Sequence, residues 1–368
     1  MLKRYRKHTI VFFVLSLLLA GKSLFAQDPT FSQFNLNQYY YNPAFTGDHG
    51  GYQFQASYRS LWPNVPGKVI PGALSNYYGV FDAYIQQGKS YAAGAGIFAM
   101  QNVEGEGMLK TSSVGLSYAQ HLFRRKPQGG RLSRIQMSLG FKAYLNFISI
   151  DWDRLVFSDQ ISIDRGITGT SAVGLSGIGR KTTADLDVGL LVKGNFRGKD
   201  KWYNELGLGM AHVLSPSLSM TEVVDANSRL PRKYHGSYRT SISLREHRYY
   251  VGTTLLFENQ QQFYAFNTGL DLYINPKGGR GLIPIWVAVM HRVALGSQAG
   301  NINAFIGSIK YKWLMGKGSR TIGFAGFTAD LPYTGLGLKS HGAYELTIGV
   351  VLPRKGNDYF SRCPFSTY

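Results

Sequence analysis

The residues of this chain that could do chemistry are a serine motif, a set of histidines and two groups of acids. Gly174-Leu-Ser-Gly177 resembles the turn that exposes a nucleophilic serine, but Ile178 stands where that sharp turn requires a second glycine. The chain contains no His-Glu-x-x-His motif, no phosphate-binding loop and no calcium-loop spacing. We therefore expect a protein that is not an enzyme and has no catalytic residue, cofactor or metal.

The acids and histidines have simpler interpretations than catalysis. Acids at 151–153 and 159–164 fall in one long predicted loop, where solvation is the favoured interpretation and cation binding the alternative. The single cysteine, Cys363, allows no intramolecular disulfide and no cysteine-rich metal site. Five histidines lie near predicted strand ends, where a solvated or interfacial imidazole is ordinary: His212, His235, His247, His291 and His341.

The composition indicates membrane strands rather than a soluble globular fold. The 368 residues include 44 glycines, 24 tyrosines and 22 phenylalanines, while charged residues make up only 17%. In an ordinary soluble domain about a quarter of the residues are charged. Glycine and aromatic residues suit crowded antiparallel strands better than helices.

The first residues have the pattern of a secretory signal. A basic start precedes an apolar run at 10–20 and small residues before Gln27. This run is shorter than the roughly 20 residues that a membrane-spanning helix needs, so we expect a cleaved signal peptide at 1–26. The basic residues of the start are Lys3, Arg4, Arg6 and Lys7.

Removing that peptide lowers the formal net charge from +19 to +14, because it contains five basic residues and no acid. A basic chain can indicate nucleic-acid binding. An exported protein rarely meets nucleic acid, and the basic residues here lie in predicted turns rather than on one helix. We therefore expect no nucleic-acid partner.

Apolar residues alternate with polar or small ones along much of the chain. From Ile135 to Phe147 every odd-numbered residue is apolar, a period-two pattern that is longer than most strands of soluble proteins. The same alternation recurs near 114–118, 186–192 and 344–352. A strand with one apolar and one polar face fits a barrel wall between lipid and a polar lumen.

About fourteen such segments predict an all-β fold, a transmembrane antiparallel β-barrel of the outer membrane. We expect the barrel at 52–352, a periplasmic or plug segment at 27–51 and a periplasmic tail at 353–368. Single-chain bacterial barrels have even strand numbers and both chain ends in the periplasm. The segments lie near 52–60, 75–86, 90–101, 111–123, 132–147, 183–194, 202–213, 236–244, 248–258, 262–274, 282–295, 301–313, 320–330 and 341–352.

The predicted connections differ in length. Those at 61–74, 148–182, 214–235 and 331–340 are long, and those between them are mostly short. Outer-membrane barrels have long outer loops and short periplasmic turns, so the long connections should face outward. Basic residues gather in the short turns, as solvated charge or alternatively as a positive rim for an acidic partner. They are Arg124, Arg125, Lys126, Arg131, Arg197, Lys199, Lys201, Lys277, Arg280, Lys317 and Arg320.

Dense aromatic stretches are interpreted as girdles, because tyrosine and tryptophan gather at both membrane surfaces. They are Tyr39-Tyr-Tyr41, Tyr77-Tyr78, Tyr249-Tyr250, Trp152, Trp202, Trp286 and Trp313.

The segment after the signal resembles the N-terminal signature of the PorP/SprF family. Gln27-Asp-Pro is followed by Phe31-Ser-Gln33 and then by Asn42-Pro-Ala-Phe-Thr-Gly47. Pro43 lacks an N–H and Gly47 tolerates a positive φ, so this motif predicts a fixed turn into the first strand. Further matches are Tyr58-Arg59, Trp62-Pro63, Asp330-Leu-Pro-Tyr-Thr-Gly-Leu336, Ala343-Tyr-Glu345 and Cys363-Pro364. The chain departs from the family pattern after Cys363-Pro364, where Phe365 follows directly and Ser-Thr-Tyr368 extends the chain.

The resemblance implies a non-enzymatic outer-membrane component of the type IX secretion and gliding apparatus. Its partner would be a secreted adhesin or exoprotein with a C-terminal type IX targeting domain, whose secretion and surface attachment it assists. A core component linked to the periplasmic ring and peptidoglycan remains an alternative. Eight residues are marked as a structural motif or partner contacts: Asn42, Pro43, Phe45, Gly47, Arg59, Trp62, Cys363 and Phe365.

A passive channel or transporter is the alternative from a different class, and an outer-membrane hydrolase is a third. About fourteen strands can enclose a lumen lined by polar residues. An inward-folded plug would exclude the channel, and residues 27–50, rich in Asn, Gln and Tyr, could form one. The polar positions expected to face the lumen are Lys142, Asn146, Asp185, Asp187, Lys193 and Arg239.

Overall fold

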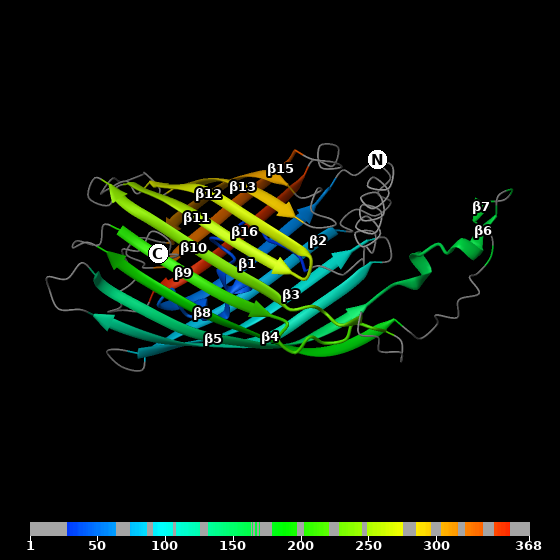
Figure 1. Ribbon diagram of the computed structural model, residues 1–368, viewed down its shortest axis with the longest axis horizontal. Coiled ribbons are helices and arrows are strands. Elements are labelled where there is room, and N and C mark those ends of the chain that lie inside the picture. The colour runs from blue at the N-terminus through cyan, green and yellow to red at the C-terminus, as the bar shows by residue number, and fades with distance from the viewer. Residues whose placement is uncertain are drawn as a thin grey trace, which may run out of the picture.

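The chain folds into a closed β-barrel (Figure 1). The first strand, β1 (Gly51–Leu61), pairs antiparallel with the last, β16 (Ala343–Pro353), and this seam closes the ring. Closure leaves no unpaired edge in the described barrel sheet, which is the condition for a sheet to cross a hydrocarbon layer. The computed structural model describes residues 28–63, 74–86, 91–105, 108–125, 132–162, 164, 166–167, 169, 179–196, 202–220, 228–244, 249–274, 285–295, 303–315, 321–333 and 342–353.

Fourteen strands form the ring in this described part of the chain, which confirms the prediction from alternation. Apart from β1 and β16 at the closing seam, ring neighbours follow one another along the chain, except that β5 pairs with β8 across a long connection that holds the β6–β7 hairpin. The strands between the first and the last are β2 (Leu74–Gln86), β3 (Tyr91–Glu104), β4 (Leu109–Arg125), β5 (Leu132–Ser149), β8 (Arg180–Phe196), β9 (Trp202–Ala211), β10 (Lys233–Leu244), β11 (Tyr249–Gln260), β12 (Phe263–Ile274), β13 (Ile285–Leu295), β14 (Ala304–Leu314) and β15 (Ile322–Pro332).

The two faces of the wall follow the predicted alternation. In β5, Leu139 is 63% exposed on the outside of the barrel, while its neighbour Ser138 is 1% exposed on the inside. Apolar residues exposed in this way cover the outer face, as contact with lipid requires. The six polar positions expected to face the lumen are all buried: Lys142, Asn146, Asp185, Asp187, Lys193 and Arg239.

The two ends of the barrel carry different connections. The longest, 150–179 and 212–232, leave from one end, here called the loop end, and β1 begins at the other, the turn end. Two connections at the loop end, 105–108 and 261–262, are nevertheless short. Connection length alone therefore does not separate the two ends.

Residues 28–50, here called the N-terminal segment, cross the lumen from the loop end to the turn end. The Asp28 amide donates to Oε1 of Gln260, the last residue of β11, at 3.0 Å, and the Gly47 amide donates to Asp82 Oδ2, toward the other end, at 2.6 Å. Asp28 and Pro353 thus lie at opposite ends of the barrel. The two ends of the described chain therefore lie on different sides of the barrel, while the termini that we expected in the periplasm fall outside the described residues.

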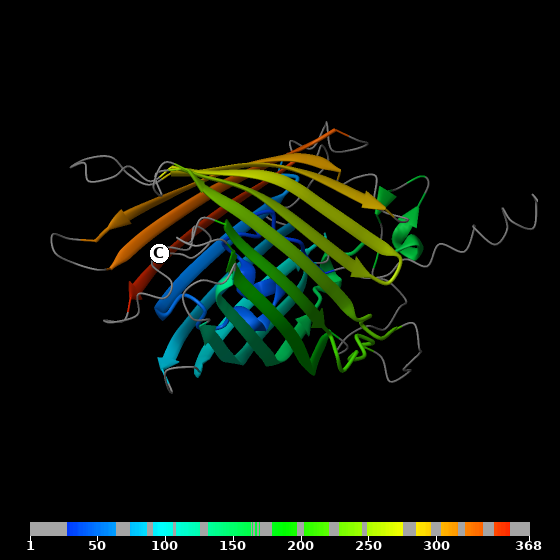
Figure 2. The same cartoon turned by 60° about the vertical axis from the view of Figure 1, so that its left-hand side comes forward.

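The N-terminal segment contains one helical turn, α2 (Gln38–Tyr41), and one 3-10 turn, η1 (Pro43–Phe45). Figure 2 shows these turns, in blue, inside the ring of strands. Aromatic residues fill the space between the segment and the wall, since an unfilled apolar gap would forfeit dispersion contacts. The cluster comprises Phe31, Phe34, Tyr39, Tyr41, Tyr78, Val80, Phe98, Tyr144 and Leu256.

Glycines let this segment approach the wall closely. A Cβ on Gly140 of β5 would lie 2.4 Å from the Ala44 nitrogen, and a Cβ on Gly189 of β8 would lie against the side-chain oxygen of Asn42. Gly47 has φ +70°, the left-handed conformation that glycine adopts without strain. The fold therefore uses glycine to seat the motif from Asn42 to Gly47.

The connection between β5 and β8 extends away from the barrel at the loop end (Figure 1). It contains two 3-10 turns, η2 (Trp152–Arg154) and η3 (Ser158–Gln160), and a hairpin of β6 (Ile161–Ser162) and β7 (Gly166–Ile167). Ile161 and Ile167 on this hairpin are 60% and 67% exposed. None of the helices in the described ranges is long and apolar enough to cross a membrane.

Gly140→Val is expected to unseat the N-terminal segment, because the added side chain collides with the backbone at Pro43 and Ala44. Overpacking of this kind costs about 1–3 kcal/mol. Limited proteolysis and thermal melting of the detergent-solubilised protein should show faster cleavage within 28–50 and a lower midpoint. Gly307→Val is the control, because Gly307 of β14 has open space around it; equal behaviour of the two variants would contradict the packing.

Candidate functional site

A buried ionic network ties the N-terminal segment to the closing seam at the loop end. Arg59 of β1 donates from Nη2 to Asp330 Oδ2 at 2.9 Å and lies 3.2 Å from Glu345 Oε2 through Nη1. Arg292 donates to the same Asp330 oxygen at 2.9 Å. Ser32 of the segment donates from its amide to Glu345 at 2.7 Å and from its hydroxyl to Asp330 at 2.6 Å. Every group is at least nine-tenths buried, so each charge depends on these partners.

A second network holds the segment near the turn end. Lys193 of β8 pairs with Asp48 of the segment and lies 3.1 Å from Glu205 Oε2. Arg239 of β10 donates from Nε to Glu205 Oε1 at 2.7 Å and from Nη1 to Asn35 at 2.9 Å. The segment is thus bound by the hydrogen bonds of Ser32 to buried carboxylates at the loop end and by the ion pair of Asp48 with Lys193 near the turn end.

A third contact fixes the start of the segment. His212, the residue after β9, lies with Nε2 2.5 Å from Asp28 Oδ2 and with Nδ1 2.6 Å from Asp185 Oδ2. Burial by itself would lower the pKa of His212, but the two carboxylates outweigh burial and raise the pKa to about 10. Burial would likewise raise the pKa of Asp28, but the charge of His212 holds it below its usual value. The pair is therefore ionised at neutral pH.

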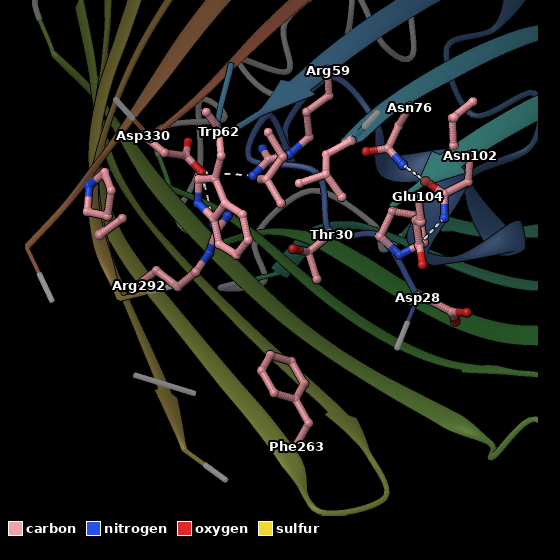
Figure 3. Close-up of a pocket in the computed structure, with 18 residues that line it drawn as sticks. Asp28, Thr30, Arg59, Trp62, Asn76, Asn102, Glu104, Phe263, Arg292 and Asp330 are labelled. Atoms are coloured by element: carbon pink, nitrogen blue, oxygen red, sulfur yellow. Dashed lines mark hydrogen bonds and ion pairs between the residues drawn. The ribbon is translucent and has the colours of Figure 1, made fainter. Parts of the chain in front are cut away.

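Two cavities open at the loop end on either side of residues 28–30. The first, here called the seam cavity, has a volume of about 230 Å³, and Figure 3 shows its lining. The second, the wall cavity, has a volume of about 310 Å³ and lies against β3, β4 and β5. Asp28, Pro29, Asn102 and Glu104 line both cavities, so the two adjoin.

The lining of the two cavities differs. In the seam cavity the ionic network of Arg59, Arg292 and Asp330 lies on one side and Glu104 with Asn102 on the other, as Figure 3 shows. Its apolar surface includes Trp62 and Phe263. The wall cavity is mostly aromatic and aliphatic, with Tyr40, Phe98, Met100, Tyr144, Ile148 and Leu230 among its lining residues. An apolar pocket with a few fixed polar groups is the usual form of a binding site.

The residues marked by sequence fall into separate places. Asn42 is buried in the N-terminal segment, where its amide nitrogen donates to the carbonyls of Leu190 and Leu208 at 3.0 and 3.1 Å. Pro43 and Phe45 are buried beside it. Arg59 and Trp62 instead meet at the seam cavity. Cys363 and Phe365 lie outside the described residues, as do the serine motif at 174–178 and the basic side chains of the turns.

Several expectations for polar and aromatic residues are wrong. His212 and His235 are buried, not solvated, because the barrel encloses them in its lumen, whereas His291 contacts the Tyr333 hydroxyl on the exposed side. Tyr39 and Tyr41 fill the lumen instead of lying at a membrane surface, since the segment that carries them folds inward. Tyr78 and Tyr250 also face inward. His247 and His341 fall outside the described part of the chain.

Sequence reasoning missed Ser32, Arg292, Asp330 and Glu345 as a group. Arg292, Asp330 and Glu345 are charged residues at positions of predicted strands that face the lumen. A charge at such a position was the feature of the sequence that could have identified them. Their meeting point depends on strand order and register, in which Arg59 is the partner of Glu345 across the seam. Within the described ranges, no group of three or more His, Cys, Asp or Glu residues is placed to hold a metal ion.

Fourteen antiparallel strands, an apolar outer face and a polar lumen define an integral β-barrel of the outer membrane. The family model described as type IX secretion system membrane protein PorP/SprF matches residues 23–350. The chain belongs to this family, which confirms the resemblance seen in its motifs. No curated protein matches the chain.

Solved barrels of other kinds are similar in outline. The toluene transporter TbuX of Ralstonia pickettii is 11% identical, with a TM-score of 0.47 over 85% of this chain and 92% of the other. The monoaromatic hydrocarbon channel CymD is 10% identical, with a TM-score of 0.46 over 90% and 95%. A FadL homologue of Pseudomonas aeruginosa is 11% identical, with a TM-score of 0.44 over 90% and 95%.

Arg59→Gln is expected to lower the free energy of unfolding by about 3–5 kcal/mol, because Asp330 and Glu345 stay buried but lose the cation that pairs with both of them. Urea unfolding in detergent, followed by tryptophan fluorescence, measures the change. The control is Arg154→Gln, which breaks the exposed pair with Asp151 and should cost less than about 1 kcal/mol. Similar losses in both variants would count against the network.

The attachment of Asp28 should be lost at alkaline pH. A folded pKa near 10 for His212 lies above the value of about 6.5 in an unfolded chain, so its stabilisation is complete below pH 6.5 and disappears as the pH rises through 10. Protease cleavage at residues 28–32 should therefore rise between about pH 8 and 10. His212→Gln should be cleaved quickly at both pH values, and His291→Gln should follow the wild type. A wild-type rate that is flat over this range would refute the ion pair.

Proposed function

We propose that this protein is a non-enzymatic component of the type IX secretion and gliding apparatus that assists the secretion and surface attachment of a partner. The partner is an adhesin or exoprotein with a C-terminal type IX targeting domain. Family membership supports the system. The observation that favours attachment over passive transport is the lumen, which the chain's own segment crosses and in which the ion pairs of Asp28 with His212 and of Asp48 with Lys193 hold it.

The proposed orientation has the loop end outside the cell and the turn end in the periplasm. The long connections at 150–179 and 212–232 support it, since outer-membrane barrels place such loops outside. The signal peptide would be 1–26, and the tail after Pro353, with Cys363 and Phe365, would be periplasmic. A mature chain beginning at Gln27 would then start at the outer end, because Asp28 lies there.

The partner would be held at the loop end. The projecting hairpin presents the exposed side chains of Ile161 and Ile167, and exposed apolar groups of this kind favour protein contacts. The two cavities open at the same end. The alternative role, a core component joined to the periplasmic ring and peptidoglycan, would instead use the turn end.

Deleting the gene is expected to remove one secreted protein, or a small set, from the cell surface. Other proteins with the same targeting domain should remain, because a dedicated partner serves only its own client. Labelling intact cells with a membrane-impermeant biotin reagent, followed by mass spectrometry, measures the change, and restoring the gene should reverse it.

Two other outcomes decide between the alternatives. Loss of every protein with the targeting domain would identify a core component, and an unchanged surface would refute the proposal. An epitope tag inserted at Gly169, a residue in open space, provides the orientation control. Antibody binding to intact cells supports the outward loop end, and binding only after lysis contradicts it.

A further inference from the structure

The seam cavity contains a carboxylate that no cation in the described ranges balances. Glu104, the last residue of β3, accepts a hydrogen bond from the Asn102 side chain, and its charged neighbour is another acid, Asp28. No Lys, Arg or His in the described ranges forms an ion pair with Glu104. A carboxyl group next to a cavity and without a counter-ion keeps its charge at low cost only if the cavity admits water or a cation, and otherwise takes up a proton.

A second unmet acceptor belongs to a residue that lines the same cavity. Asp330 is 4% exposed, and its Oδ2 accepts from Arg59, Arg292 and Ser32, whereas its Oδ1 has no hydrogen-bond partner among the residues that the structure describes. A buried acceptor without a donor costs about 1–3 kcal/mol. Because Asp330 lines the seam cavity, a donor that enters the cavity can approach this residue.

Among the described residues, carboxyl groups outnumber cations around the cavity, although the protein as a whole is basic. The charged groups that line it, together with those directly paired to them, are three cations and four carboxylates. The cations are Arg59, Arg292 and His212, and the carboxylates are Asp28, Glu104, Asp330 and Glu345. Aromatic surface from Trp62 and Phe263 adds a face on which a cation can rest.

We propose that the seam cavity binds a lysine or arginine side chain carried by an extended segment of the secreted partner. A volume of about 230 Å³ accommodates one long side chain. A guanidinium group suits the site best, because its planar set of donors matches carboxylates and stacks on aromatic rings. The adjoining wall cavity would bind a neighbouring apolar side chain of the same segment. A small free amine has no such side chain and could not fill this second cavity. The identity of the partner rests on the proposed function, while the chemistry of the cavity does not.

The test uses the full-length protein in detergent and two fluorescein-labelled tripeptides. One has arginine between two leucines, and the other has citrulline, its neutral isostere, in the same place. Fluorescence polarisation should show that the arginine peptide binds about tenfold more tightly or better, as a charged hydrogen bond contributes. Glu104→Gln should reduce this preference to about twofold or less.

The control variant is Asp151→Asn, which removes an exposed acid at the same end and should keep the preference of the wild type. Equal affinities for the two peptides, no binding of either at millimolar concentration, or an unchanged preference in Glu104→Gln would overturn the proposal. Free arginine amide that binds as tightly as the tripeptide would do so too, since it would show a small-molecule site.

In cells, Glu104→Gln should release the partner into the medium while the barrel remains folded, which its heat-dependent mobility on gels reports. Full surface attachment in this variant, together with loss of attachment in the gene deletion, would refute binding of the partner at the seam cavity. The proposed function would then still hold. An unchanged surface in the deletion would instead refute the proposed function.

Discussion

Charge buried in the lumen is the constraint on which most of this structure depends. Isolated charges in a protein interior are costly, so Arg59 must have both Asp330 and Glu345 in place. Those partners lie on β15 and β16, and Arg59 lies on β1, so the network stabilises the seam that closes the ring. Ser32 hydrogen-bonds to both carboxylates, which makes seating of the N-terminal segment part of closure.

The N-terminal segment gives the barrel an interior that its strands alone lack. Eight strands leave a space that side chains fill, and larger barrels enclose water or a ligand. Here fourteen strands surround a segment whose aromatic groups pack against the wall and whose polar groups pair with it. The outer face can therefore be apolar and the inner face ionic, with a packed interface between wall and segment.

The fold was largely predictable because strand alternation is a local property. The segment from Ile135 to Phe147 shows its two faces without any knowledge of its neighbours, and the structure keeps that phase. The same reasoning placed Lys193 and Arg239 inside. It misjudged Tyr39 and His212, because a tyrosine or histidine suits both a membrane surface and a filled lumen, and local sequence does not distinguish the two.

The sequence by itself determined the barrel, its strand number, its polar lumen and its family, because each follows from local periodicity or from a motif. The tertiary structure alone decided that the N-terminal segment fills the lumen and that Asp28 lies at the opposite end from Pro353. It also decided that Arg59, Asp330 and Glu345 meet and that Glu104 has no ion-pair partner within the described part of the chain. These facts depend on strand register and on contacts between residues nearly 300 positions apart, such as the pair of Arg59 and Glu345 at a separation of 286. No local pattern encodes such a contact, since its energy exists only once the ring has closed.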